Sequence, residues 1–230
     1  MTIEEYKMNF FDSVIGDILR SIDGKCRTAP FTLISCTIDI LSFIENGDKK
    51  NSFNAWMKMW LHPINSRYDD VVMYGLRNAF VHTHGSSKIL RKNKVVFNLR
   101  TGRNSRINPL PNLGRFHTNS NDVILLCLSD FLSEIILASN RFFNGLKKIE
   151  VNNPSDLGLK KIKNRLDEQI KNKNETWKDG KPILEIQTMS SYKQIHKALE
   201  IFDRNQTPTI EELTFELDRI LYPESNDDNF

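Results

Sequence analysis

The stretch DDVVMYGLRNAFVHTHG, residues 69–85, predicts an amphipathic helix over residues 69–82 that is ended by Gly85. At about 100° of rotation per residue, its apolar side chains fill one side of the helix without interruption. The opposite side displays a carboxylate, a phenol, a guanidinium, an amide and an imidazole, from Asp70, Tyr74, Arg77, Asn78 and His82. This arc is either an ordinary solvated face or a functional one, and the absence of Lys and Glu from it favours function.

The flanking sequence predicts further helices packed around this one. Apolar patterns indicate helices over residues 4–22, 31–44, 52–61 and 122–148, the last capped by Asn119, Ser120 or Asn121. A small β-hairpin is predicted over residues 88–99 around Lys92 and Asn93, with a short strand near Phe116. The predicted fold class is mainly α: an up-and-down helical bundle with a small β-hairpin inserted before the last core helix.

The chain divides by composition into two parts. Residues 1–150 form the predicted helical domain, and residues 151–230 form a C-terminal helical extension whose role the sequence does not disclose. Within the extension, helices are expected near residues 156–171, 191–202 and 210–221, with a linker over residues 172–182.

Composition excludes several classes of protein. Hydrophobic residues make up 39% of the chain, enough for a core. The longest apolar stretch, residues 123–138, is interrupted by Asp130 and Glu134, so no membrane span is expected. Three cysteines without a CxxC pair, and an N-terminus without a signal pattern, favour the cytoplasm. We find no glycine-rich phosphate loop and no cluster of metal-binding carboxylates, so neither a cofactor nor a metal is expected.

Basic residues are concentrated in one span, residues 86–118, which contains no Asp or Glu. The rest of the chain is net acidic, so this span is expected to meet an anionic polymer, unless it is simply a solvated basic loop. The candidate RNA-binding residues in it are Arg91, Lys92, Lys94, Arg100, Arg103, Arg106 and Arg115, and Lys88 completes the set of basic side chains.

Arg77, Asn78 and His82, in the string LRNAFVH, resemble the motif of an arginine, a polar residue, three further residues and a histidine that marks HEPN domains. These are small helical domains of many prokaryotic ribonucleases and toxins. A mostly apolar helix with a lone acid, Asp39, lies upstream as in many members, and a long helix follows. The resemblance covers about residues 1–150 and implies an HEPN-like bundle with a metal-independent endoribonuclease activity, in a toxin or a phage-defence effector.

The resemblance implies a role for each motif residue. His82 would be the acid or base at the ribose 2′-hydroxyl or the leaving oxygen, and Arg77 would bind the scissile phosphate. Asn78 would orient the phosphate or the imidazole. The residue types suit these roles, because imidazole titrates near neutrality and guanidinium offers paired donors to phosphate oxygens. Asp39 is expected to be a structural hydrogen-bond partner near this helix.

The resemblance also raises the question of partners. Arg77 and His82 lie about 140° apart on an ideal helix, so a homodimer with a composite site is expected to bring the two groups together. Some HEPN toxins carry a modifiable tyrosine where this chain has His84, so regulation by that route is doubtful. His84 is more simply a structural or solvent-facing residue than a catalytic one, and His82 with His84 lacks a third metal ligand nearby.

Three functions therefore compete. The first is an RNA-cleaving enzyme, with RNA as substrate and an antitoxin as a possible partner. The second is a catalytically inactive HEPN dimerisation or RNA-binding adaptor. The third is a DNA-binding regulator that uses the basic span and the two C-terminal helices, although nothing there resembles a recognition helix strongly.

Overall fold

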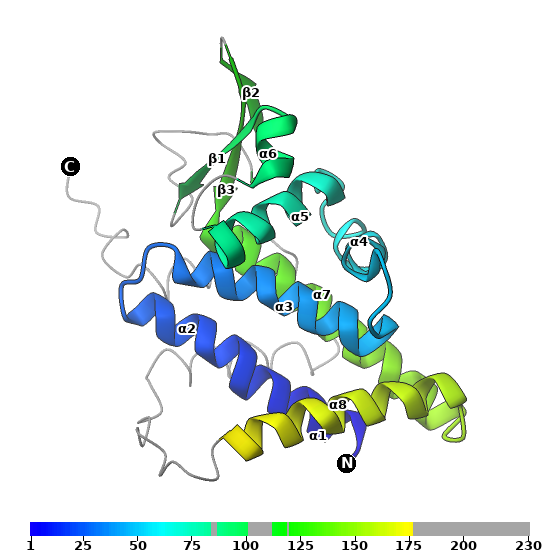
Figure 1. Cartoon of the computed structure of the whole chain (residues 1–230). Helices are drawn as coiled ribbons and strands as arrows, with labels where there is room; N and C mark the ends of the chain where they lie inside the picture. The colour runs from blue at the N-terminus through cyan, green and yellow to red at the C-terminus, as the bar shows by residue number, and fades with distance from the viewer. Residues whose placement is uncertain (84–86, 101–111, 119, 177–230) are drawn as a thin grey trace, which may run out of the picture.

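The computed structural model describes residues 1–83, 87–100, 112–118 and 120–176, and it is mainly helical with a small three-stranded sheet. The sheet lies at one end of the molecule, and the helix bundle makes up the rest (Figure 1). The predicted helices near residues 191–202 and 210–221 lie outside the described residues, as do His84, Gly85, Arg103, Arg106 and Asn119. Among the described helices, none is long and apolar enough to cross a membrane.

The N-terminal half of the bundle is two long helical segments joined by a short turn. The first runs through α1 (Ile3–Phe10), the π-helical η1 (Phe11–Ile15) and α2 (Gly16–Asp23), and it begins with a capping box between Thr2 and Glu5. The second is α3 (Ala29–Asn46), which ends at Gly47 with a positive φ of 69°. Both predicted helices are confirmed, each extended slightly at its ends.

Two shorter helical segments follow and carry the predicted motif. The first consists of α4 (Ser52–Trp56) and the π-helical η2 (Met57–Leu61), and the second of α5 (Asp70–Asn78) and the π-helical η3 (Ala79–Thr83). Asp69 caps α5, because its side chain accepts a hydrogen bond from the Val72 amide at 3.0 Å. The predicted helices over residues 52–61 and 69–82 are thus confirmed, with π-helical turns that the sequence pattern did not indicate.

The β-hairpin predicted over residues 88–99 is wrong, although the strand predicted in its second half is present. Its first half is a helix, α6 (Lys88–Lys92), capped by the Ser87 side chain. Lys94, with a φ of 53°, then turns the chain into β1 (Val95–Arg100). β1 pairs in parallel with β3 (Asp122–Cys127), and β2 (Arg115–His117) pairs antiparallel with β3, so the order is β1-β3-β2. The hairpin before the last core helix is therefore β2–β3, and the short strand near Phe116 is confirmed.

The helix predicted over residues 122–148 is wrong at its start. Residues 122–127 form β3, and α7 (Leu128–Asn152) begins after Cys127, which makes no side-chain capping bond. The predicted caps at Ser120 and Asn121 therefore do not cap it. The continuous apolar run VILLC fits a buried strand as well as a buried helix, so periodicity alone could not separate the two.

α7 and α3 form the centre of the core, and the last described helix packs on them. The largest fully buried side chains include Trp56, Phe31, Phe131, Phe142 and Phe143. α8 (Leu157–Thr176) buries Leu159 and Leu166 and confirms the predicted helix over residues 156–171. The linker predicted over residues 172–182 is wrong at its start, because residues 172–176 continue this helix, and its remainder lies outside the described residues. Arg165 of α8 donates hydrogen bonds of 2.7 Å to the carbonyls of Ile44 and Glu45, at the end of α3. α8 therefore packs against the helices of the predicted first domain.

Candidate active site

The motif residues form one hydrogen-bonded cluster on α3, α5 and η3, which we call the Arg77 cluster: Asp39, Arg77, Asn78 and His82. The Nη1 atom of Arg77 lies 2.9 Å from His82 Nε2 and donates to Asn78 Oδ1 at 3.0 Å. The Nε atom of Arg77 donates to Asp39 Oδ2 in an ion pair. The structure thus brings together all three residues predicted to be catalytic, and Asp39 from the helix upstream.

The π-helical turn η3 explains how Arg77 and His82 meet. A π turn bonds residues five positions apart, and Arg77 and His82 have this separation. The expected gap of about 140° assumed a regular α-helix throughout, and that assumption was wrong. A second copy of the chain is therefore not needed to bring the two side chains into contact. The homodimer itself stays a prediction.

The hydrogen bond between Arg77 and His82 fixes the protonation of the imidazole in this arrangement. Guanidinium nitrogens only donate, so His82 Nε2 accepts and carries no proton. The neutral ring then holds its proton on Nδ1. His82 is exposed, so a hydroxyl from solvent can reach Nε2 once it takes the place of the Arg77 donor. This is the state that a general base needs before the reaction.

Asp39 is the anion that balances Arg77. Its side chain is 28% exposed and that of Arg77 is 21% exposed, so both lie partly within the protein. Burial raises the pKa of Asp39, while the hydrogen bond and the charge of Arg77 lower it in part. Burial also raises the pKa of the nearby Cys36 thiol, and the Asp39 charge adds to this effect. Because its Oδ2 atom accepts from Arg77 Nε, the Asp39 carboxylate holds the guanidinium in one orientation against α3.

The other two polar residues of the predicted arc face elsewhere. Asp70 Oδ1 lies 2.8 Å from Nε2 of His62, which follows η2, and its Oδ2 lies 3.3 Å from Nζ of Lys58 within η2. Tyr74 is 38% exposed and packs edge-on against Phe53, with 5.5 Å between ring centroids. The arc therefore splits into two sets, and Tyr74 does not join the Arg77 cluster.

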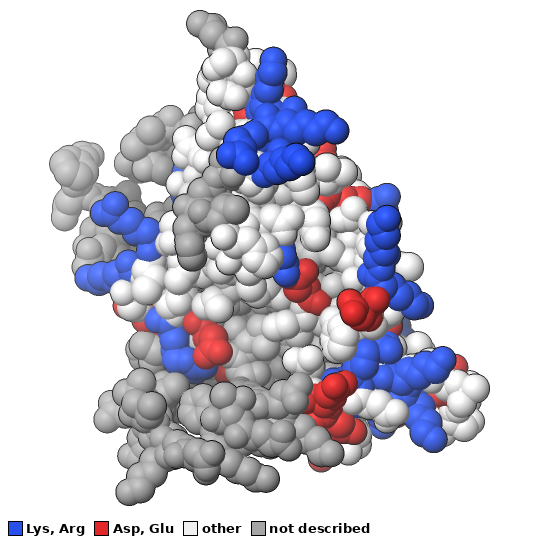
Figure 2. Space-filling view, viewed as in Figure 1, with Lys and Arg blue, Asp and Glu red and all other residues white. Residues whose placement is uncertain are grey.

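The predicted RNA-binding residues do not form one set either. Arg91, Lys92 and Lys94 are exposed, together with Lys88, where α6 meets β1. Figure 2 shows a concentration of basic side chains at the sheet end of the molecule. Arg115 instead lies 3.3 Å from Asp69 in an ion pair, and Arg100 is half-buried. Arg103 and Arg106 lie outside the described residues.

Sequence reasoning missed a buried polar cluster at the start of α5, which we call the Glu134 cluster. Glu134 of α7, 3% exposed, accepts hydrogen bonds from Asn65 at 2.8 Å, Tyr68 at 2.5 Å and Asn112 at 2.9 Å. Burial raises the pKa of Glu134 to about 7 despite these bonds. The available signal was the pair of acids, Asp130 and Glu134, inside the apolar run of residues 123–138.

The described residues contain no group of three or more His, Cys, Asp or Glu side chains that could hold a metal ion. Comparisons with known protein families, with curated proteins and with solved structures found no match to this chain. A proposal for its function therefore rests on the geometry and chemistry of the Arg77 cluster.

Proposed function

We propose that this protein is a metal-independent endoribonuclease of the HEPN type, which acts in the cytoplasm as a toxin or a phage-defence effector. The observation that carries the proposal is the 2.9 Å contact between Arg77 Nη1 and His82 Nε2. It sets a guanidinium beside an unprotonated imidazole nitrogen, so one group can bind a phosphate while the other removes a nearby proton.

His82 acts first on the ribose 2′-hydroxyl. Nε2 takes the hydroxyl proton, the 2′-oxygen forms a bond to phosphorus, and the bond from phosphorus to the 5′-oxygen breaks. The products are a 2′,3′-cyclic phosphate and a 5′-hydroxyl, whose proton comes from His82 of a second copy in a homodimer, protonated when that copy acted as the base in an earlier turnover. Proton uptake by His82 also ends its hydrogen bond with Arg77, since both groups would then be donors.

Arg77 stabilises the charge that builds on the phosphate. Among the described residues, its contacts with Asp39, Asn78 and His82 use Nε and Nη1. The two Nη2 protons are then left for a phosphate oxygen, and the contacts with Asp39 and Asn78 keep the guanidinium in place when His82 takes up its proton. Asp39 and Asn78 are positioning residues in this scheme, because they act through Arg77.

The test is cleavage of RNA by the full chain in excess chelator. Wild-type protein should release 2′,3′-cyclic phosphate ends and should fail on 2′-deoxy substrates. His82→Ala and Arg77→Lys should each lower the rate about a hundredfold or more. His117→Ala is the matched control, since His117 is an exposed histidine whose Nδ1 lies 2.5 Å from Asp122 instead. Full activity in His82→Ala, or equal cleavage of DNA, would refute the proposal.

One observation favours the adaptor as the second candidate. The ion pair between Asp39 and Arg77 links α3 to α5 and neutralises much of the arginine charge, as a purely structural pair would. An adaptor would dimerise and bind RNA but leave it intact, with His82→Ala unchanged in both properties. Light scattering supplies the dimer part of this test, since a monomer at micromolar concentration would argue against a site shared between copies and against dimerisation.

A further inference from the structure

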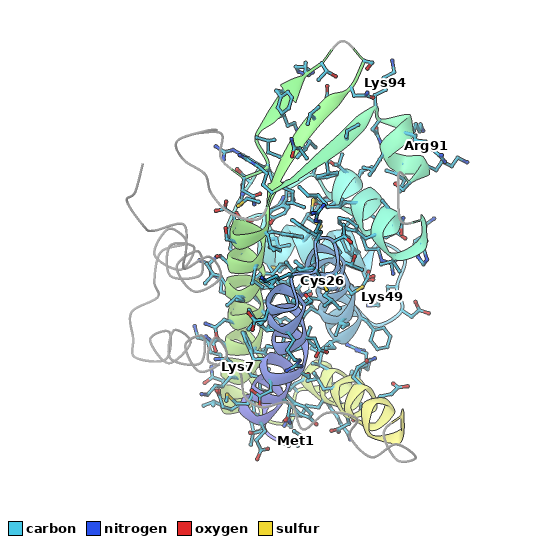
Figure 3. All side chains as sticks on the ribbon, turned by 90° about the vertical axis from the view of Figure 1, so that its left-hand side faces the viewer. Met1, Lys7, Cys26, Lys49, Arg91 and Lys94 are labelled. Atoms are coloured by element: carbon cyan, nitrogen blue, oxygen red, sulfur yellow. The ribbon has the colours of Figure 1, made fainter. Side chains whose placement is uncertain are left out.

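Four basic side chains stand together where α6 leads into β1, and we call them the basic corner: Lys88, Arg91, Lys92 and Lys94. All four are exposed, and Figure 3 shows Arg91 and Lys94 projecting from this end of the molecule. Within the described part of the chain, none of the four side chains forms an ion pair, whereas Arg115 is paired with Asp69. The corner therefore presents positive charge that no acid among the described residues neutralises.

An exposed apolar row crosses the sheet next to this corner. Val96 of β1 and Phe116 of β2 both stand opposite Val123 of β3 in the strand register. Directly paired residues project from the same face of a sheet, so the three side chains form one row. Val96 is 47% exposed and Phe116 is 38% exposed. An aromatic ring on an open sheet face beside basic residues is typical of surfaces on which nucleic-acid bases stack.

Close packing fixes the corner to the helix that carries Arg77. A Cβ atom added at Gly75 of α5 would lie 3.0 Å from side-chain carbons of Ile89 and Leu90 in α6. A larger residue at this position would require the side chains of Ile89 and Leu90 to shift, so α6 packs closely on α5. The basic corner is thus held at a constant position relative to α5, rather than on a separate arm.

We propose that the basic corner and the row of Val96, Val123 and Phe116 together bind single-stranded RNA. The inference rests on the proposed function and deepens it by naming the surface and the form of the substrate. The corner holds phosphates without reading sequence, and Phe116 stacks on an unpaired base. A duplex keeps its bases stacked on one another, so it offers the corner its phosphates but offers Phe116 no base face.

Binding is measured with His82→Ala protein, so that the RNA stays intact, by fluorescence anisotropy of labelled strands of about 12 nucleotides. Four charges are removed from the corner by changing Lys88, Arg91, Lys92 and Lys94 to Gln. The matched control removes four charges from the turns beside α3 by changing Lys25, Arg27, Lys49 and Lys50, all exposed, to Gln. The corner variant should bind unrelated single strands at least tenfold more weakly, and the control should bind as the parent does.

The salt dependence of binding reports how many phosphates the corner neutralises. For a single strand, every phosphate that the variant no longer neutralises reduces the slope of log affinity against log salt by about 0.7, so the four substitutions reduce it by about three. Phe116→Ser should weaken single-strand binding several-fold without changing the slope of log affinity against log salt, and Phe116→Trp should retain the binding. Equal weakening in the corner and control variants, or an unchanged slope in the corner variant, would overturn the inference.

Two further outcomes separate this inference from its alternatives. Duplex RNA bound as tightly as single strands, or vesicles containing phosphatidylserine bound more tightly than RNA, would overturn it. Cleavage by wild-type protein is assayed in parallel. RNA binding through the corner without cleavage would refute the enzyme but keep the surface, and cleavage with unaltered binding by the corner variant would refute the surface but keep the enzyme.

Discussion

Helix α5 has a polar cluster at each end, and the two clusters differ in burial. The Glu134 cluster, before the helix, is enclosed, and its carboxylate is 3% exposed. The Arg77 cluster, at the end of the helix, leaves His82 exposed and its arginine 21% exposed. Enclosed polar groups must be satisfied by protein partners, whereas a half-open cluster can exchange a partner for a ligand. The comparison assigns stability to the first cluster and chemistry to the second.

Glu134 joins three segments that are distant in sequence. Tyr68 and Asn65 lie in the segment that leads into α5, and Asn112 also accepts a hydrogen bond from the Cys127 amide at 3.0 Å. One carboxylate on α7 therefore positions the start of α5 and the end of β3 at the same time. The Arg77 cluster, by contrast, links only α3 to the α5–η3 segment.

The largest effect on stability is expected from Glu134→Ala. The change leaves the buried donors of Asn65, Tyr68 and Asn112 without their acceptor, which should lower the free energy of unfolding by about 3–5 kcal/mol. Urea denaturation followed by circular dichroism measures it. The cleavage rate per folded molecule should stay near the wild-type value, and a specific loss of cleavage would show that the two clusters do not have separate roles.

The second prediction concerns the pH dependence of stability. Burial raises the pKa of Glu134 to about 7, above its value in the unfolded chain, so the folded state binds more protons between these two pKa values. The contribution of Glu134 to the free energy of unfolding should be greatest below about pH 4, and it should fall by roughly 3 kcal/mol as the pH rises to about 7. Two neighbours also act on this pKa: the hydrogen bond from Tyr68 lowers it, and the charge of Asp130 raises it.

Glu134→Gln isolates this contribution, because glutamine has nearly the same shape and does not titrate. Unfolding free energies from urea titrations at pH values between about 4.5 and 7 should change less in the variant than in wild type. The difference between the two proteins removes the effects of all other titrating groups. Identical slopes would mean that Glu134 is ionised throughout, and hence that its donors outweigh its burial.

Much of the helical fold could be predicted from the sequence, whereas of the sheet only the strands near residues 94–99 and Phe116 could, and not the way the strands pair. Helical periodicity indicated α3, α5 and α8 because their apolar residues recur at spacings of three and four. Residues 122–127 were assigned to a helix because a short continuous apolar run fits both structures. Their partner β1 precedes them by more than 20 residues and runs parallel, a pairing without a local signal.

The candidate site, too, could be predicted only in part from the sequence. The types and spacing of Arg77, Asn78 and His82 were readable, but their contact depends on a π turn that a uniform rotation of about 100° omits. The Glu134 cluster was beyond sequence reasoning, because Tyr68 lies 66 positions from its acceptor. An acid within an apolar run indicates a buried partner but does not identify it.

The smallest effect on stability is expected from Asp39→Asn, and it tests the role given to the Arg77 cluster. The ion pair is partly exposed, and the asparagine oxygen can still accept from Arg77 Nε, so unfolding should change by about 1 kcal/mol or less. Catalysis should respond more strongly. Without the carboxylate, the guanidinium is held less firmly in the orientation that leaves Nη2 for a phosphate oxygen.

The steady-state constants for RNA cleavage by this variant separate positioning from simple stabilisation. The kcat should fall about tenfold, since the misplaced arginine costs transition-state binding. The KM should not rise, because removing an acid beside Arg77 leaves the site more attractive to phosphate in the ground state. Asp39→Glu should restore part of kcat if its longer side chain still reaches Nε, whereas Asp39→Ala, which removes the acceptor, should reduce kcat more than Asp39→Asn does. A purely structural pair would instead give the wild-type kcat per folded molecule in all three variants, and the half-open cluster would then differ from the buried one only in exposure.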